Sequence, residues 1–418
     1  MSKNKINQNL TKNIIRFQLG ANLFFYLILA TSSLIEKKYK IGLNLWNYLS
    51  GNGRFDDLIN SAKFGYSNFD YQAITEIRKT FVWPNSPLSS LLSEVAQFFV
   101  SGPEDAPFVI FVLYLILSKS LFGIASNKLY CWLVVTNFPI IFLFSRGNTD
   151  ILILVILMVI LNNVSKNNSL VAILIGIVAG IKFPFLLLVF VFVITREYKK
   201  VLIALFTFIL SNVVPIILMP FTLIDSLKAY FEMLKRYNQV YILQDGGTLW
   251  NNSFFGFCKS VYYLINKNRL NSESIDSIKF LLNFNYVVSI LFVLITTAIL
   301  FKVSKNLLLD TEVLFLAIFL LTVTVIIIGP ISATYRIALL VPFFLIALEK
   351  FKSLTLTEYF LFTLICLPKT FIYFTSSYYT VGFTLDSIIN PVLLFMLWVR
   401  LMVIIISYKP HQKQNLKK

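Results

Sequence analysis

Residues 145–200 read SRGNTDILILVILMVILNNVSKNNSLVAILIGIVAGIKFPFLLLVFVFVITREYKK, which is a series of apolar runs separated by short polar breaks. The runs 149–163, 169–181 and 183–195 each hold only about 13 to 15 residues, whereas a helix that crosses a bilayer upright needs about 20. Short, broken apolar helices are typical of membrane proteins in which such helices line a cavity. This stretch therefore predicts a helical membrane protein with functional interruptions.

The rest of the chain repeats this apolar pattern. Of its 418 residues 57% are hydrophobic and 16% aromatic, and the mean hydropathy is +0.76, which no soluble domain with an ordinary surface would tolerate. Candidate spans start near residues 18, 106, 128, 149, 169, 183, 200, 279, 312, 334, 354 and 386. We expect one all-α integral membrane domain over residues 1–418 with about 12 spans, in which the apolar stretch 88–101 is re-entrant or interfacial.

The net charge of +17 reflects basic residues that lie mostly between the apolar runs. Membrane topology explains them better than nucleic acid does, because Lys and Arg favour the cytoplasmic side. With both basic tails in the cytoplasm, the number of crossings is even and the long segments 36–87 and 220–277 become extracytoplasmic loops, large enough to cap a cavity. We expect a multi-pass protein of the cell (inner) membrane with cytoplasmic termini and no nucleic-acid partner.

Residue types exclude several kinds of catalytic site. The single histidine, His411, lies in the polar C-terminal tail, which excludes histidine general-base chemistry and histidine metal sites. Cys131, Cys258 and Cys366 are scattered in or beside apolar stretches, without the spacing of a disulfide framework or a metal site. We expect no metal and no cofactor, so any acid–base chemistry falls to carboxylates.

Three isolated cations fall at polar breaks on the predicted extracytoplasmic side. Lys182 stands beside Pro184 in GIVAGIKFPFLLL, Arg146 and Asp150 flank SRGNTD, and Arg336 opens a helix in GPISATYRIALLVP. A charge in the membrane core costs at least about 2.5–3.5 kcal/mol on insertion scales, so each cation needs a reason. We interpret all three as candidate phosphate-binding groups. The alternatives are snorkelling of the lysine and the late arginine, and an ordinary Arg–Asp turn at SRGNTD.

The two outer loops carry the candidate base and sugar-binding residues. Asp56 and Asp57 are adjacent in GNGRFDDLINSAKFGY, although most loop acids are simply solvated. Trp83 lies in the proline-bracketed turn FVWPNSPL, and Asn251 and Asn252 follow a tryptophan in GGTLWNNSFFGF. Amides beside aromatic rings suit hydroxyl-rich ligands. An interfacial helix anchored by its aromatic residues is the alternative for the second loop.

In their order and spacing, these motifs resemble the GT-C membrane glycosyltransferases, most closely glycosyltransferase family 87, the polyprenyl-phosphate-mannose-type mannosyltransferases. Residues 145–200 look like the family's Gly-Asn-x-Asp segment, small-residue helix, Lys-x-Pro break and basic turn. FVWPNSPL at 81–88 resembles its aromatic-Pro-Pro-Leu corner, and WNNSFFG at 250–256 its Asn-Ser-Gly segment. PISATYRIALLVP at 330–342 is similar to its late Pro-to-Pro element.

The resemblance implies a GT-C-like bundle that transfers a mannose-like hexose, with inversion, from a polyprenyl-phosphate-sugar donor to a glycan or glycolipid acceptor outside the membrane. The base that it implies in the first outer loop falls on Asp57 or Asp56, and we favour Asp57. The three cations would hold the donor phosphate. The further candidates for substrate binding are Asp150, Trp83, Asn251 and Asn252.

Two other functions fit the same broken helices and cations. A transporter or flippase of lipid-linked sugars would use them without breaking or forming a covalent bond. Inverted internal repeats would favour this alternative, and we find none in the sequence. An enzyme related to O-antigen ligases or polymerases would also act on polyprenyl-linked glycans outside the membrane. The paired acids in a large outer loop favour an enzyme.

Overall fold

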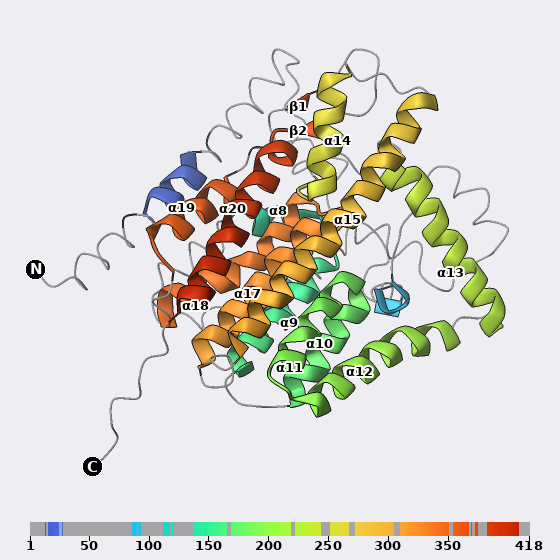
Figure 1. The fold of residues 1–418 in the computed structure, drawn as a ribbon, viewed down its shortest axis with the longest axis horizontal. Coiled ribbons are helices and arrows are strands. Elements are labelled where there is room, and N and C mark those ends of the chain that lie inside the picture. The colour runs from blue at the N-terminus through green and yellow to red at the C-terminus, as the bar shows by residue number, and fades with distance from the viewer. Residues whose placement is uncertain are drawn as a thin grey trace, which may run out of the picture.

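Helices make up most of the described residues in this computed structural model of the chain (Figure 1). The structure describes residues 13, 16–24, 27, 86–89, 91–92, 112–117, 119, 137–146, 148–164, 169–218, 222–243, 251–266, 272–304, 310–350, 354–367, 369, 373–374 and 383–408. Strand pairing among these residues is limited to a two-residue antiparallel ladder, β1 (Tyr373–Phe374) with β2 (Phe383–Thr384), and an isolated bridge between Asn251 and Ala333. The predicted helical character of the fold is confirmed.

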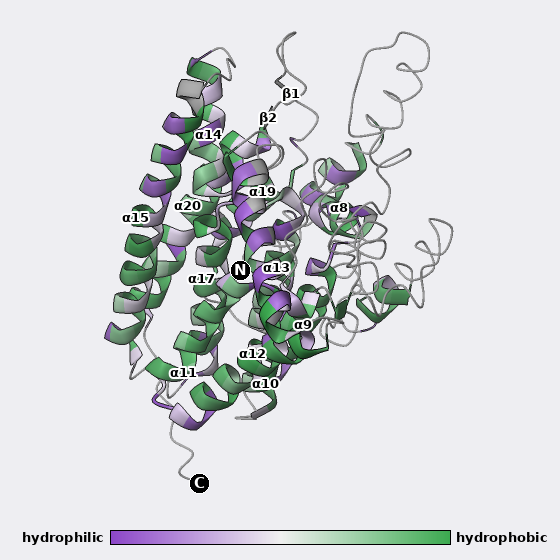
Figure 2. Cartoon of the chain, turned by 90° about the vertical axis from the view of Figure 1, so that its right-hand side faces the viewer, coloured by the Kyte–Doolittle hydropathy of each residue, from purple (hydrophilic) through white to green (hydrophobic). Residues whose placement is uncertain are grey.

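Four described helices are long and apolar enough to cross a membrane. They are α12 (Tyr198–Ile217), α15 (Ser272–Lys302), α17 (Thr311–Ile328) and α20 (Asp386–Ser407). The apolar window of α17 is 78% buried, against 17% in α12 and 22% in α15, so α17 forms the core and the other two present apolar side chains outward. Hydrophobic residues predominate along α12 and the lower part of α15 in Figure 2, as expected of lipid-facing helices. The total of about 12 spans stays a prediction.

Polar contacts fix the directions of the central helices. Trp398 Nε1 on α20 lies 3.1 Å from the hydroxyl oxygens of Thr296 on α15 and Thr324 on α17. Ser289 donates to the carbonyl of Ile328 at 3.1 Å, and Tyr408 donates to Asp310 at 2.6 Å. Helix α17 therefore runs antiparallel to α15 and α20. We call the end of the bundle formed by residues 328–336 and 386–390 the Asp386 end.

The short helices predicted from residues 145–200 are present. They are α9 (Asp150–Asn163), α10 (Ser169–Ile181) and, over the third run, the 3-10 helix η3 (Phe183–Val189) followed by α11 (Phe190–Ile194). Helix α8 (Phe138–Arg146) precedes them. The chain reverses at Lys182, whose backbone is extended, and Pro184 lies in the first turn of the next helix, where its missing N–H costs no hydrogen bond. The break predicted at this lysine and proline is therefore real.

Two further short elements follow α17. The 3-10 helix η6 (Thr334–Leu340) leads into α18 (Val341–Lys350), and α19 (Leu356–Cys366) then packs against α20. Since Gly329 and Pro330 end α17, η6 begins at the Asp386 end, and its first turn carries Arg336.

Much of the segment 220–277, predicted as the second outer loop, is helical. It contains α13 (Leu223–Tyr237), the π-helix η4 (Asn238–Leu243), α14 (Phe254–Ile265) and the start of α15. Helix α13 lies at the edge of the molecule beyond the end of α12 and carries many hydrophilic residues (Figures 1 and 2). Helix α14 packs on α15 and α20, where Ser260 lies 3.1 Å from Ser387. The segment therefore contributes packed structure at the Asp386 end.

Candidate functional site

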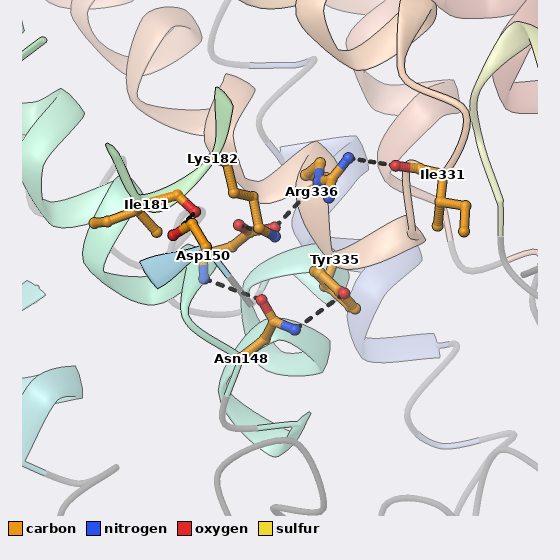
Figure 3. A network of polar contacts seen from close by, with 8 residues as sticks. Asn148, Asp150, Ile181, Lys182, Ile331, Tyr335 and Arg336 are labelled. Atoms are coloured by element: carbon orange, nitrogen blue, oxygen red, sulfur yellow. Dashed lines mark hydrogen bonds and ion pairs between the residues drawn. The ribbon is translucent and has the colours of Figure 1, made fainter. Parts of the chain in front are cut away.

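Three of the predicted site residues meet in one ion-paired group at the Asp386 end (Figure 3). Lys182 Nζ pairs with one carboxylate oxygen of Asp150, and Arg336 Nε lies 3.3 Å from the other. We call these residues the ion triad. The Asp150 side chain is 0% exposed, whereas Lys182 and Arg336 are 20% and 14% exposed. Two cations from distant parts of the sequence thus share one buried carboxylate and remain partly accessible.

Asp150 is the first residue of α9, and its surroundings hold it there. Its N–H donates to the side-chain oxygen of Asn148 at 3.0 Å, and the amide of Asn148 donates to the Tyr335 hydroxyl at 3.0 Å. A carboxylate in the first turn of a helix also interacts favourably with the helix dipole. Asn148 therefore joins the start of α9 to the residue next to Arg336.

Lys182 is placed by the break between α10 and η3. Its extended backbone separates the two helices, and the preceding carbonyl, of Ile181, accepts a hydrogen bond from Ser86 at 2.9 Å. Ser86 belongs to the proline-bracketed turn near the start of the family-like motifs. The lysine ammonium also lies 5.9 Å from the centre of the Tyr335 ring. The turn at 86–89 thus supports the backbone from which this cation projects.

Arg336 is placed by a turn that two buried asparagines hold. Its N–H donates to Ala333, and its Nη1 donates to the carbonyl of Ile331. Asn251 donates to the carbonyl of Pro330 at 2.9 Å and accepts from the N–H of Ser332 at 2.8 Å. Asn251, from the predicted second outer loop, therefore fixes the backbone just before Arg336.

Asn252 links this turn to α20. Its amide nitrogen donates to Thr334 at 3.1 Å, and its amide oxygen accepts from Asn390 at 3.0 Å. Thr334 and Thr384 both donate to the carboxylate of Asp386, which is fully buried. This second polar group therefore braces the first residue of η6, two positions before Arg336.

The remaining candidates have different outcomes. Arg146 ends α8, and it is not one of the two cations that pair with Asp150, so the Arg–Asp turn considered for SRGNTD is not the pairing observed. Asn251 and Asn252 are both 0% exposed and hydrogen-bonded to the turn before Arg336.

Three candidates, Asp56, Asp57 and Trp83, lie outside the described residues. Within the part of the chain that the structure describes, His, Cys, Asp and Glu side chains form no group of three that could hold a metal ion.

Sequence reasoning missed three contributors to the site: Asn148, Tyr335 and Asp386. Asn148 belongs to the Gly-Asn-x-Asp segment but was given no role. Asp386 opens a long apolar run much as Asp150 does, and an acid at the start of such a run was the available signal. Tyr335 carried no signal, because a single tyrosine beside an arginine is common in interfacial segments.

Comparison with protein families now identifies the class of protein. The model of glycosyltransferase family 87 matches residues 81–330, which is more than half of the chain. Together with the apolar helices, this match makes the protein a membrane glycosyltransferase. The chain belongs to glycosyltransferase family 87. The matched region includes Asp150 and Lys182 and ends shortly before Arg336. No curated protein and no solved structure matches the chain.

Proposed function

We propose that this enzyme transfers a mannose-like hexose from a polyprenyl-phosphate-sugar donor to a glycan or glycolipid acceptor on the extracytoplasmic side of the cell membrane, with inversion. The observation that carries this proposal is the ion triad, in which Lys182 and Arg336 converge from separate elements at one end of an apolar bundle. Partly accessible cations beside lipid-facing helices suit a ligand that has a phosphate head and an apolar tail.

The chemistry requires few groups. In the proposed step the acceptor oxygen forms a bond to the anomeric carbon while the bond from that carbon to the phosphate oxygen breaks. The polyprenyl phosphate leaves as a stabilised anion, so no general acid is needed, and Lys182 and Arg336 stabilise the charge that develops on it. The acceptor proton passes to a carboxylate base, Asp57 or Asp56, in the first outer segment. Trp83 would supply an aromatic wall for the sugar.

The direction of the helices supports an extracytoplasmic site. Helices α10 and α12 run parallel, because Gly176 lies against Ala204 and Gly180 against Ser211. The basic turn 196–200 at the start of α12 and Lys302 at the end of α15 therefore lie at the end of the bundle opposite the ion triad. Since short basic connections favour the cytoplasm, the triad and the Asp386 end face outward. Helix α20 ends at this same cytoplasmic end, and the basic residues of the N-terminal tail favour a cytoplasmic N-terminus as well.

The test is a transfer assay with the full-length enzyme in proteoliposomes. The donor is a short-chain polyprenyl-phosphate hexose, and the lipid-linked products are followed by mass spectrometry. A positioned base contributes about 10²–10⁴-fold, so Asp57→Asn, or Asp56→Asn if that residue is the base, is expected to lower the rate by about that factor.

Asp70→Asn, which changes another acid of the same segment, is the matched control and is expected to keep the rate. Full transfer by both the Asp56→Asn and the Asp57→Asn variants would refute the base assignment. Movement of intact donor across the bilayer with no new glycosidic bond would instead indicate a flippase.

A further inference from the structure

The ion triad has an uneven charge balance. It combines two cations, Lys182 and Arg336, with the single carboxylate of Asp150. The described triad therefore carries one net positive charge. Whatever else touches Lys182, the Asp150 carboxylate removes one unit of positive charge from the place where the two cations meet.

The geometry separates the charge that a ligand meets from the charge that compensates it. The Asp150 side chain is completely buried, whereas both cations keep part of their surface accessible. The backbone of Asp150 is also held in place, because Asp150 is the first residue of α9 and its N–H donates to Asn148, which in turn donates to Tyr335. An incoming anion therefore meets the cations first, and Asp150 stays as a permanent counter-ion.

Charge balance matters more at this site than at an open surface. The triad adjoins apolar helices, and a charge interaction strengthens as the effective dielectric constant falls. An anion with one negative charge neutralises the triad. An anion with two leaves one negative charge uncompensated in surroundings where unpaired charge is costly.

We propose that Asp150 sets the charge of the donor that the enzyme accepts, by cancelling one of the two cationic charges so that a singly charged lipid phosphodiester is preferred over a doubly charged lipid diphosphate. This inference rests on the proposed function, because it concerns the donor phosphate of that same site. It assigns Asp150 to donor selection rather than to contact with the sugar.

The experiment measures binding with two probes that differ by one phosphate and carry no sugar. They are citronellyl methyl phosphate, with one negative charge, and P1-citronellyl P2-methyl diphosphate, with two. Dissociation constants are determined by calorimetry on the full-length enzyme in detergent. Wild type is expected to prefer the singly charged probe. Asp150→Asn is expected to shift the ratio of the two constants by about tenfold or more toward the doubly charged probe.

A second variant separates a charge effect from a folding defect. Asp150→Asn combined with Lys182→Met restores a single net positive charge, so its ratio is expected to return toward the wild-type value even though both probes bind more weakly. Glu358→Gln is the matched control, since Glu358 is also fully buried and paired with an arginine, Arg400 at 2.7 Å, but lies outside the triad. This control is expected to leave the ratio unchanged.

The outcomes distinguish this inference from the proposed function. An unchanged ratio in Asp150→Asn, or an equal shift in Glu358→Gln, would overturn the role of Asp150 while transfer by wild type still upheld the proposed function. A ratio that shifts as expected, in an enzyme that transfers no hexose from any polyprenyl phosphate, would overturn the proposed function alone. Failure of wild type to bind either probe would overturn both.

Discussion

At the scale of single residues, the two buried carboxylates of Asp150 and Glu358 are compensated in different ways. Glu358 accepts hydrogen bonds from the N–H of Thr355 at 2.6 Å and from the Thr355 hydroxyl, and it pairs with Arg400, so its own helix cap provides much of its compensation. Asp150 instead relies on two cations from distant segments. Two cations therefore meet at Asp150, whereas a single cation and a helix cap share Glu358, so the pair of cations is what distinguishes the candidate site.

Arg336 serves this site through its shape as well as its charge. Its Nε reaches Asp150 while its Nη1 reaches the carbonyl of Ile331, and a lysine ammonium cannot hold both partners in the same geometry. Arg336→Lys is expected to lower the transfer rate about tenfold. Arg336→Gln, which also removes the charge, is expected to lower it by about 10²–10³-fold. Both are measured in the proteoliposome assay.

Arg400→Lys provides the control for this pair of variants. Arg400 also binds a buried carboxylate through Nε, but it lies on α20 outside the ion triad, so its variant is expected to transfer at nearly the wild-type rate. A wild-type rate for Arg336→Gln would show that this guanidinium does not act on the donor phosphate.

Sequence reasoning selected residues at which a charge interrupts an apolar run, and their role in donor binding stays a prediction. Lys182 and Arg336 were identified because such interruptions are costly in a membrane, and the structure brings them together. Their common partner was not predictable, since Asp150 lies only four residues after Arg146 in the sequence, and local spacing favoured that pair. Contacts between residues 150 and 336 depend on how helices pack, which a single sequence does not reveal.

At the scale of elements, close packing of α10 on α12 sets the position of Lys182. A Cβ added at Gly176 would lie 2.6 Å from the carbonyl oxygen of Ala204, and one at Gly180 would lie 2.6 Å from the Cβ of Ser211. Small residues four apart let membrane helices approach in this way. Because Lys182 directly follows α10, displacement of this helix would move the cation.

Gly176→Ala is therefore expected to destabilise the enzyme by about 1–3 kcal/mol, since a backbone carbonyl cannot move aside cheaply. Gly20→Ala is the matched control. It also lies in a helix, but no atom lies within 4 Å of its added Cβ, so this change is expected to be neutral or to stabilise by up to about 1 kcal/mol. Thermal unfolding in detergent measures both. Equal stabilities of the two variants would contradict the packing argument.

The accuracy of the predicted helices depended on whether the sequence pattern was a long apolar run or a mixture of charged and apolar residues. Long apolar runs predicted α17 and α20 closely, because a continuous run fixes where a helix starts and ends. The segment 220–277 was described as a loop, yet it includes α13 and α14. Helix α13 mixes charged and apolar residues, and such a helix is not recognised by a search for apolar runs.

At the scale of the whole molecule, the two ends of the bundle differ in chemistry. The Asp386 end gathers the ion triad and the buried amides that hold its turn. At the opposite end Tyr408 donates to Asp310 and lies 3.1 Å from Glu312. Burial, followed by these two carboxylates, raises the pKa of Tyr408, so its hydroxyl stays protonated. This end carries the short basic connections, which together with the triad give the bundle a defined polarity.

This polarity predicts which cysteines an impermeant reagent reaches. In a variant in which Cys131, Cys258 and Cys366 are replaced by serine, Asn266→Cys places one exposed thiol just beyond α14, and Lys199→Cys places one in the basic first turn of α12. A membrane-impermeant maleimide applied to intact spheroplasts is expected to label position 266 and not position 199, and permeabilisation should expose both. Labelling of position 199 alone in intact spheroplasts would reverse the orientation and place the ion triad on the cytoplasmic side, where a donor presented outside the cell could not reach it.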